Sequence, residues 1–326
     1  MMSKTTFFIL LSILCVGPIF SQYTSIPNSC FESILVSQNI DSDNTVNGQV
    51  LTSDINTITY LDLRPNIHTC SVSDIVGIED FAMLEILNVN NANLSSIDMS
   101  SNLQLKRLFC KNNTISQINV TQNSLLELLD CSDNSINSID VSYNSDLKFL
   151  ILNQNYILNI NLNNNDLLEI ISIKNNLINS LNINNNINLR AIQCDFNPIN
   201  SIDMTPHNLL EYINIGNTQL SNLDISQNIQ LLRLRFQNTP QITNIDLTNN
   251  PQLNWLWCQD NNLTALDLSQ NSLLDILNCS NNQLTALNVQ NGANSLLTGT
   301  YLNAPFGYED RFMADGNANL SCILVD

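Results

Sequence analysis

Residues 126–146 read LELLDCSDNSINSIDVSYNSD, and this phrase decides the fold of the chain. It recurs along most of the sequence, usually with a spacing of 21 residues between opening leucines. The opening residues of the copies are Leu84, Leu105, Leu126, Leu147, Leu168, Leu189, Leu210, Leu231, Leu253 and Leu274. A fixed period of this length is typical of a solenoid, in which one short unit stacks on copies of itself. Such a fold offers a long binding face rather than a buried catalytic pocket.

Each copy divides into two similar halves. The first half reads LxxLxCxxN and the second reads IxxIDVxxN, and each contains a brief alternation of apolar and polar residues. That alternation predicts a short strand in each half. The Asn residues that close the halves suit turns, because side-chain amides bond readily to backbone groups.

The composition limits the classes of partner. The chain has 326 residues, 44% of them hydrophobic, and its 11 basic and 29 acidic residues give a net charge of −18. Nucleic acid is therefore not expected as a partner, because phosphate binding needs a basic stripe. Residues 1–21 predict a secretory signal, with Lys4 before an apolar run and the small Ser21 at the end. No later stretch is long and apolar enough for a membrane span, so we expect a secreted or cell-envelope protein.

The rest of the chain is expected to form three segments. Residues 22–83 would be an N-terminal cap with a short helix and a first half-repeat, and residues 84–294 would hold ten repeats. Residues 295–326 would form a closing loop and a cap strand. The sequence SCFE at 29–32 reads as a capping box for the helix, and residues 320–325 follow the spacing of a first half-repeat.

Seven of the nine cysteines fall into two groups. Cys30 and Cys70 lie in the cap, where a disulfide is expected of a secreted protein. Five others share one repeat position: Cys110, Cys131, Cys194, Cys258 and Cys279. Other copies carry apolar residues there, so we interpret these thiols as small core residues, free rather than paired between coils. No zinc site is expected, because one Cys per repeat lacks the close Cys/His pairs of such sites.

The phrase LxxLxCxxNxLxxLDLxxNxx resembles the 21-residue class of bacterial leucine-rich repeats, sometimes called IRREKO repeats, over about residues 58–326. The cap sequences NIDSDNTVNGQVLTSDI and DIVGIEDF also look like the N-terminal cap of secreted bacterial members. The resemblance implies a right-handed solenoid of the α/β-horseshoe type, rich in β-structure and poor in helix. A parallel sheet would line one face and short extended segments the other. The resemblance also implies an extracellular or envelope setting and a binding or adhesion role without a cofactor.

One group of outward residues is a candidate binding site. In the first half-repeat the third and fifth residues should point away from the core, because the fourth and sixth face it. The only two tryptophans, Trp255 and Trp257, hold these positions, with Arg233 and Arg235 on the strand beside them and Tyr212 one strand further. Trp, Tyr and Arg are enriched at interface hot spots. We therefore predict a ligand-binding site here; the alternative is that Arg and Trp only cover each other and stabilise the sheet.

A second candidate surface is apolar. Its outward residues on neighbouring copies are Phe109, Leu128, Phe149, Ile151 and Ile170. An exposed apolar patch usually marks a contact surface. A covering loop would explain the same residues equally well.

The second half-repeat presents a row of acids and amides. Its members are Asp62, Asp98, Asn119, Asp140, Asn161, Asn182, Asp203, Asp224, Asp246, Asp267 and Asn288. Calcium could relieve repulsion between stacked carboxylates, but we favour hydrogen bonds to nearby hydroxyls and turn amides. Asp41, Asp43, Asn47 and Asp54 form a second acidic group, whose spacing does not match an EF-hand loop. No cofactor is expected, and calcium at either group is the open alternative.

Enzyme motifs are absent from the sequence. The only histidines are His68 and His207, and His207 stands where most repeats have a turn Asn. The favoured function is a secreted, non-catalytic module that binds a protein through the outward face of the repeat sheet. A glycan-binding adhesion protein that uses the Trp pair and a passive envelope protein are the alternatives. The sequence does not decide the oligomeric state.

Overall fold

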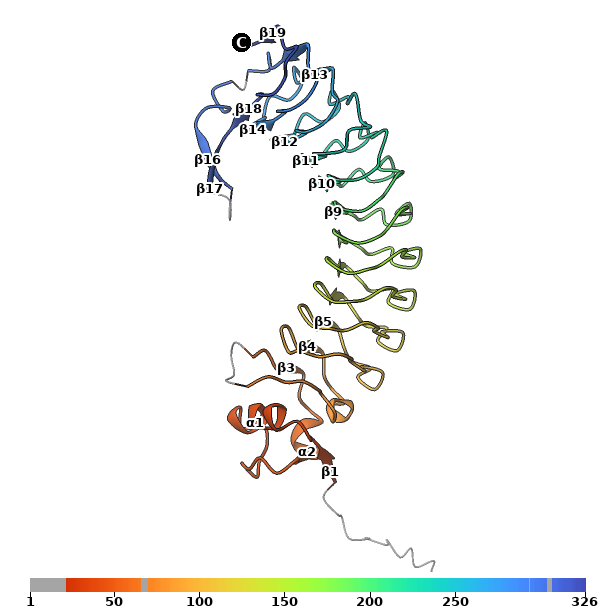
Figure 1. The fold of residues 1–326 in the computed structure, drawn as a ribbon. Coiled ribbons are helices and arrows are strands. Elements are labelled where there is room, and N and C mark those ends of the chain that lie inside the picture. The colour runs from red at the N-terminus through yellow and green to blue at the C-terminus, as the bar shows by residue number, and fades with distance from the viewer. Residues whose placement is uncertain (1–21, 66–69, 293, 304–306) are drawn as a thin grey trace, which may run out of the picture.

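The protein is a curved stack of coils, seen in a computed structural model that describes residues 22–65, 70–292, 294–303 and 307–326 (Figure 1). The predicted signal segment at 1–21 and His68 lie outside the described residues. Successive coils each add one strand to a 12-stranded sheet that lines the concave side. Its strands are β3 (Tyr60–Asp62), β4 (Ile86–Asn88), β5 (Arg107–Phe109), β6 (Leu128–Asp130), β7 (Phe149–Ile151), β8 (Ile170–Ser172), β9 (Ala191–Gln193), β10 (Tyr212–Asn214), β11 (Arg233–Arg235), β12 (Trp255–Trp257), β14 (Ile276–Asn278) and β18 (Phe312–Met313).

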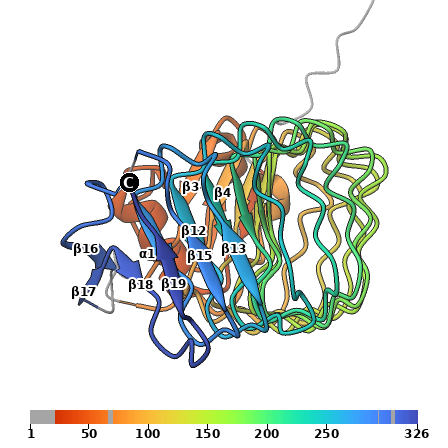
Figure 2. The ribbon, with the colours of Figure 1, turned by 90° about the horizontal axis from the view of Figure 1, so that it is seen from above.

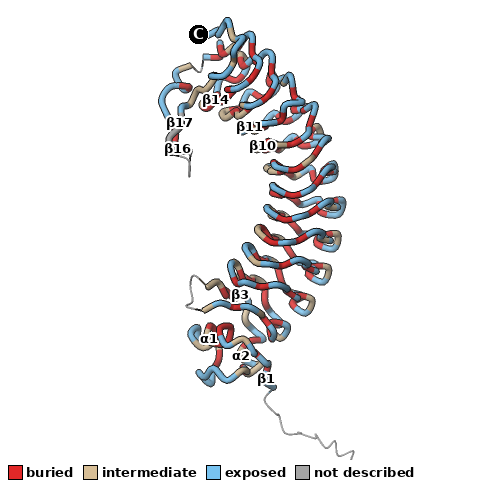
Figure 3. The backbone as a smooth tube through the Cα atoms, viewed as in Figure 1, coloured by how far each residue is buried: buried red, intermediate tan, exposed pale blue. Residues whose placement is uncertain are grey.

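Neighbouring strands of this sheet run parallel, and the repeat spacing sets their register. Leu129 of β6 faces Leu108 of β5 and Leu150 of β7, and all three are fully buried. Their neighbours Leu128 and Asp130 are only partly buried, as expected for a period of two. Buried residues therefore recur in every coil (Figure 3). The predicted parallel sheet along one face is confirmed.

Each coil turns after its strand through one residue in the left-handed backbone region. These residues are Asn91, Asn112, Asp133, Gln154, Asn175, Phe196, Asn217, Asn238, Asp260 and Asn281. Asn and Asp tolerate this region better than other non-glycine residues, because their short polar side chains bond locally. The repeat sequence therefore selects the turn as well as the strand.

Buried asparagines join each coil to the one before. Asn134 donates from Nδ2 to the carbonyls of Cys110 and Cys131, and its Oδ1 accepts from the backbone N–H of Ile115. Asn165 closes the other half and donates to the carbonyls of Val141 and Asn144. The turn asparagines of the repeat are thus part of the core.

His207 replaces one of these asparagines. It is fully buried, and its Nε2 lies 3.0 Å from the carbonyl of Ile183, as an Asn amide would. The histidine is therefore a structural residue of the turn, as predicted.

The C-terminal end differs from the expected layout. Residues 320–325 were expected to follow the first half-repeat, but β19 (Cys322–Leu324) pairs with β15 (Ala286–Asn288), which pairs with β13 (Ala265–Asp267) on the other side of the coil. The main sheet is instead continued by β18. The spacing of apolar residues is similar in the two halves, so it did not distinguish them.

A hairpin interrupts the last coil. It consists of β16 (Thr300–Asn303) and β17 (Gly307–Asp310), paired antiparallel. The hairpin lies on the concave side of the arc (Figure 1). From above it extends outside the outline of the coils (Figure 2).

The N-terminal end of the stack is covered by α1 (Ser29–Ser37), α2 (Thr52–Ile55), the 3-10 helix η1 (Ile78–Asp80) and the antiparallel pair β1 (Tyr23–Ser25) and β2 (Gln49–Leu51). The capping-box prediction was wrong. Asn28 caps α1 by accepting from the N–H of Phe31, while Glu32 turns away and accepts from the N–H groups of Asn47, Gly48 and Gln49.

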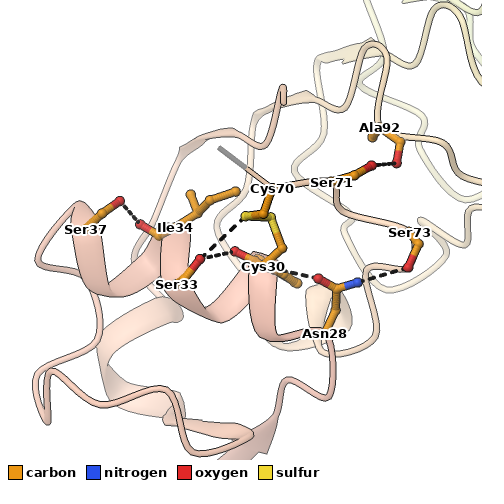
Figure 4. Close-up of a disulfide and its surroundings, with 10 residues drawn as sticks. Asn28, Cys30, Ser33, Ile34, Ser37, Cys70, Ser71, Ser73 and Ala92 are labelled. Atoms are coloured by element: carbon orange, nitrogen blue, oxygen red, sulfur yellow. Dashed lines mark hydrogen bonds between the residues drawn. A yellow bond between two sulfur atoms is a disulfide. The ribbon is translucent and has the colours of Figure 1, made fainter. Parts of the chain in front are cut away.

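A disulfide joins Cys30 of α1 to Cys70 across 40 residues of sequence (Figure 4). Ser33 lies beside this bond and donates to the carbonyl of Cys30. Asn28 adds a bond from its side chain to the hydroxyl of Ser73. These contacts tie α1 to the segment that leads into the first coils.

Candidate functional site on the concave face

The register of β10, β11 and β12 brings the five predicted binding residues together. Tyr212 faces Arg233, which faces Trp255, and Arg235 faces Trp257. The residue between each outward pair is buried, Leu234 in β11 and Leu256 in β12. The side chains of both tryptophans therefore lie on the concave side of the sheet and outside the core.

Arginine and tryptophan stack on one another across these strands. The guanidinium carbon of Arg235 lies 4.0 Å from the ring centre of Trp257 and 5.0 Å from that of Trp255. The guanidinium of Arg233 lies 5.1 Å from the ring centre of Trp255. Such contacts contribute about 0.5–1 kcal/mol each at an exposed site. Arg233 is exposed, and Arg235, Trp255 and Trp257 are partly buried. We call these four residues the platform, because their mutual contacts restrain them while part of each remains accessible to a ligand.

The hairpin covers one side of this platform. Tyr301 of β16 packs edge-on against Trp255, with ring centres 5.4 Å apart, and Tyr301 is only 8% exposed. Trp255 also packs edge-on against Trp257 at 5.6 Å. The sequence predicted a closing loop here but gave no sign that it reaches the tryptophans, since the insertion has no counterpart in other repeats.

Several polar atoms around the platform lack partners within the described part of the chain. They are the Nε1 atoms of Trp255 and Trp257 and the Oε1 atoms of Gln237 and Gln259, all buried. Buried polar atoms are normally hydrogen-bonded, and an unsatisfied one costs about 1–3 kcal/mol. All four atoms are enclosed by their neighbours, so a ligand would reach them only if the surrounding side chains moved.

Gly216 gives Gln237 its position. A Cβ atom at residue 216 would lie 2.5 Å from Cδ and Nε2 of Gln237. The amide of Gln237 therefore lies over the backbone of the preceding coil. Only glycine permits this close approach.

Asp195 and Phe196 extend the site by one coil, and sequence reasoning missed both. Asp195 is 3% exposed, and its Oδ1 has no partner among the described residues. Burial raises the pKa of this carboxyl, while Lys174 and Arg235 oppose that shift. The available signal was a charged residue at the seventh repeat position, two residues after the end of β9.

Phe196 holds a strained backbone while presenting its ring to solvent. Its φ is 55° and its side chain is 51% exposed. Among the described residues with left-handed backbone, the others are Asn, Asp, Gln or Gly. Strain of this kind is concentrated at functional sites. A hollow of about 240 Å³ lies between Phe196, Lys174, Asn175 and Gln154.

Tyr212 of β10 lies on the side of the platform away from the hairpin, next to Arg233. Burial raises the pKa of its phenol, and the nearby positive charge of Arg235 partly offsets this effect. Tyr212 therefore stays neutral at physiological pH and acts as a hydrogen-bonding aromatic group.

The predicted apolar patch lies on β5 to β8. Leu128 faces Phe149, which faces Ile170, and all of its members are partly buried. The patch thus forms a continuous surface along the same face as the platform.

Asp62 was predicted to belong to the row of acids and amides, but it lies in β3 of the main sheet, opposite Asn88 of β4. The rest of the row lies on the other side of the coils, where its members form local turns. Asp203 accepts from the N–H and hydroxyl of Thr205, and Asp246 bonds Thr248 in the same way. These bonds hold the pKa values of both carboxyls below the ordinary range. Among the described residues, no three His, Cys, Asp or Glu side chains come together as a metal ion would need.

The acidic group of the cap is also bonded internally. Asp43 accepts from the N–H and hydroxyl of Thr45, and Asp54 accepts from the N–H of Ser42. Asp41 is buried, and burial raises its pKa, with the nearby acids adding to the shift. Its Oδ2 has no partner in the described segments.

A row of alternating charges, here called the charge ladder, lies at the N-terminal ends of successive strands, and sequence reasoning missed it. The second residues of seven successive repeats are Glu85, Lys106, Glu127, Lys148, Glu169, Arg190 and Glu211. Lys106 pairs with Glu85, Lys148 with Glu127 and Arg190 with Glu211. The repeat alignment already contained this signal.

The repeated-position thiols behave as core residues. Cys110, Cys131, Cys194, Cys258 and Cys279 are all buried and free. Burial raises the pKa of the Cys279 thiol to about 12. None of the five forms a disulfide, as interpreted from the sequence, but the Sγ atoms of Cys110 and Cys131 on adjoining coils lie only 2.6 Å apart.

Solved structures share this architecture. An internalin (InlF) of Listeria monocytogenes is 19% identical to this chain. The match covers 92% of this chain and 97% of the internalin, with a TM-score of 0.68. The chain has the leucine-rich repeat fold. The internalin C2 of the same organism is 21% identical over 65% of this leucine-rich repeat chain and 96% of its own, with a TM-score of 0.57. The leucine-rich repeat part of FLRT2, from an octameric complex with Latrophilin 3 and Unc5D, is 21% identical over 70% of this chain and 76% of its own, with a TM-score of 0.57.

No family model matches the sequence, and no curated protein matches it. In the described part of the leucine-rich repeat chain, no helix has the length and apolar character of a membrane span. Each of these three solved structures is below 25% identity. They therefore show the fold, and the function has to be argued from the residues on the concave face.

Proposed function

We propose that the chain is a non-catalytic binding protein and that its concave face, centred on Trp257, takes a protein partner. The observation that carries the proposal is the Arg233–Arg235–Trp255–Trp257 cluster on two adjoining strands. Aromatic residues and arginine supply most of the energy at protein interfaces. A rigid platform also lowers the entropic cost of binding, since few side chains need to be ordered.

The contacts of the indoles favour a protein over a glycan. A sugar ring stacks on a free indole face, whereas the guanidinium of Arg235 already lies over Trp257 and close to Trp255. A partner side chain can instead bond the guanidinium groups of Arg233 and Arg235. We propose that the apolar patch on β5 to β8 extends the same interface.

Two structural neighbours form complexes on this fold. FLRT2 is part of a complex with two other proteins. The ectodomain of the plant receptor kinase GASSHO1 of Arabidopsis thaliana is in complex with CASPARIAN STRIP INTEGRITY FACTOR 2. Both are consistent with a protein ligand for the present chain.

The proposed setting is extracellular or in the cell envelope. The signal-like sequence at 1–21 supports export, and the Cys30–Cys70 disulfide suits an oxidising compartment.

Selection from a displayed peptide library tests the proposed site. Peptides selected on the immobilised protein should lose binding to Trp257→Ala by about 2 kcal/mol or more. Tyr143→Ala is the matched control, because Tyr143 is 62% exposed and lies outside the concave strands. Failure to select any peptide that depends on the concave residues would contradict the proposal.

A further inference from the structure

The concave face carries positive charge on a strongly acidic protein. The third, fifth and seventh residues of the ten first half-repeats point outward, and these positions hold five basic residues: Arg107, Lys111, Lys174, Arg233 and Arg235. The same positions hold two acids, Asp130 and Asp195. The chain as a whole has 11 basic and 29 acidic residues. The cations are therefore gathered on the surface where a ligand would bind.

Within the described residues, the cations without an ion pair all lie on this face. Among the basic residues in the described ranges, those without an ion pair are Arg107, Lys174, Arg233 and Arg235. Basic residues elsewhere are neutralised in place, as Arg190 is by Glu211 on the charge ladder. The chain has many carboxylates that could pair with these four cations, yet none within the described residues does. Their positive charge is therefore available to a partner.

The geometry of the arginines suits a carboxylate. The guanidinium carbon of Arg235 lies 4.0 Å from the ring centre of Trp257, which restricts its movement, and Arg233 stands exposed beside it. A guanidinium can bind a carboxylate through two parallel hydrogen bonds. Aromatic stacking leaves the N–H edges of the guanidinium free for this contact.

We propose, building on the function proposed above, that the concave face recognises an acidic polypeptide segment whose carboxylates bind Arg233 and Arg235. The segment runs along the face towards Lys174, where the hollow beside Phe196 takes a further side chain. Charge attraction across the face also speeds association at low salt.

A direct titration tests the charge requirement. The probe is a short peptide of alternating Glu and Ser, with matched peptides that carry Gln or Lys in place of Glu, followed by tryptophan fluorescence. We expect the Glu peptide to change the emission and bind about tenfold more tightly than the Gln peptide, with affinity falling as salt rises. Equal binding of the Glu and Gln peptides, or no binding of the Glu peptide, overturns the proposal.

Two variants with the same change of charge locate the site. Arg235→Gln should weaken binding of the Glu peptide by about tenfold, because it removes a bidentate partner. Arg190→Gln removes one positive charge from the ladder, outside the platform, and should change the affinity by less than about twofold. Equal losses in the two variants would mean that net charge alone drives binding.

Other outcomes separate this inference from the proposed function. Library peptides that need Trp257 but are neutral or basic would leave the function in place and refute the acidic segment. Binding of polygalacturonate in preference to the Glu peptide would point to an acidic glycan and would contradict both.

Discussion

Asn134 joins its coil to the previous one through Cys110: its Nδ2 donates to the carbonyl oxygen of Cys110 at 3.0 Å, inside the core. The same side chain accepts from the N–H of Ile115. Asn155 and Asn176 repeat the arrangement one and two coils later. The solenoid is thus held by side-chain bonds between coils as well as by its strands.

Asn134→Ala should lower the free energy of unfolding by about 2–4 kcal/mol, because it leaves buried backbone groups without partners. Urea unfolding followed by circular dichroism measures this. Asn137→Ala is the control, since Asn137 is exposed, and it should change stability by less than about 0.5 kcal/mol. Similar losses in both variants would show that the buried bonds contribute little.

His207→Asn should stabilise the protein by about 1 kcal/mol. Asn186, one coil earlier, donates to two carbonyls, those of Leu162 and Asn165, whereas His207 contacts only that of Ile183. The substitution should restore the second bond. A lower melting temperature for the variant would instead show that the imidazole fills space that Asn leaves empty.

Phe196→Asn should stabilise the fold by about 1 kcal/mol, since Asn accepts the left-handed backbone more readily. If the ring anchors a ligand, the same change should weaken binding of the Glu peptide. Thermal unfolding and the fluorescence titration measure the two effects. Tyr156→Asn serves as the control, since it also removes an exposed ring, but from a residue outside the left-handed set.

Removal of the disulfide by Cys30→Ser and Cys70→Ser should cost about 3–4 kcal/mol, because the bond closes a loop of 40 residues in the unfolded chain. Unfolding in urea with and without reductant measures the loss. Cys322→Ser changes an exposed free thiol and should have little effect. Insensitivity of the wild-type protein to reductant would contradict the prediction.

The aspartate row should contribute to acid sensitivity. The pKa values of Asp203 and Asp246 are lowered by their threonine bonds, so their contribution is present above the ordinary value near 3.8. It is lost as the pH falls through the lower folded pKa values. Replacing both by Asn should therefore flatten the pH dependence of stability in this acid range. Asp146→Asn, at an exposed site outside the row, is the control for net charge.

The sequence predicted the parts of the fold that repeat. The leucine spacing placed Trp257 beside Arg235 because each coil must present the same face to its neighbour. It could not place Tyr301 on Trp255, since the hairpin occurs once and has no repeat to compare with. It also assigned the last strand to the wrong sheet, because both halves of a coil share the same apolar spacing.

The site was only partly predictable for a related reason. Alternation along a strand shows which residues point outward, and it identified the Arg–Trp pairs. It does not show which outward polar groups become buried by their neighbours, as Asp195 does. That depends on the sizes of side chains on adjacent coils, including the missing side chain of Gly216.

Because the coils stack in register, the number of coils between two residues of the concave face sets the distance between them. Asp195 and Arg235 lie two coils apart, and strands in a sheet are separated by about 4.8 Å. Duplicating the coil that contains β10 would move the two residues apart by one such step while Arg235 and Trp257 stay adjacent. A solenoid of this kind can therefore match partners of different length by gaining or losing whole coils, without altering the chemistry of any one of them.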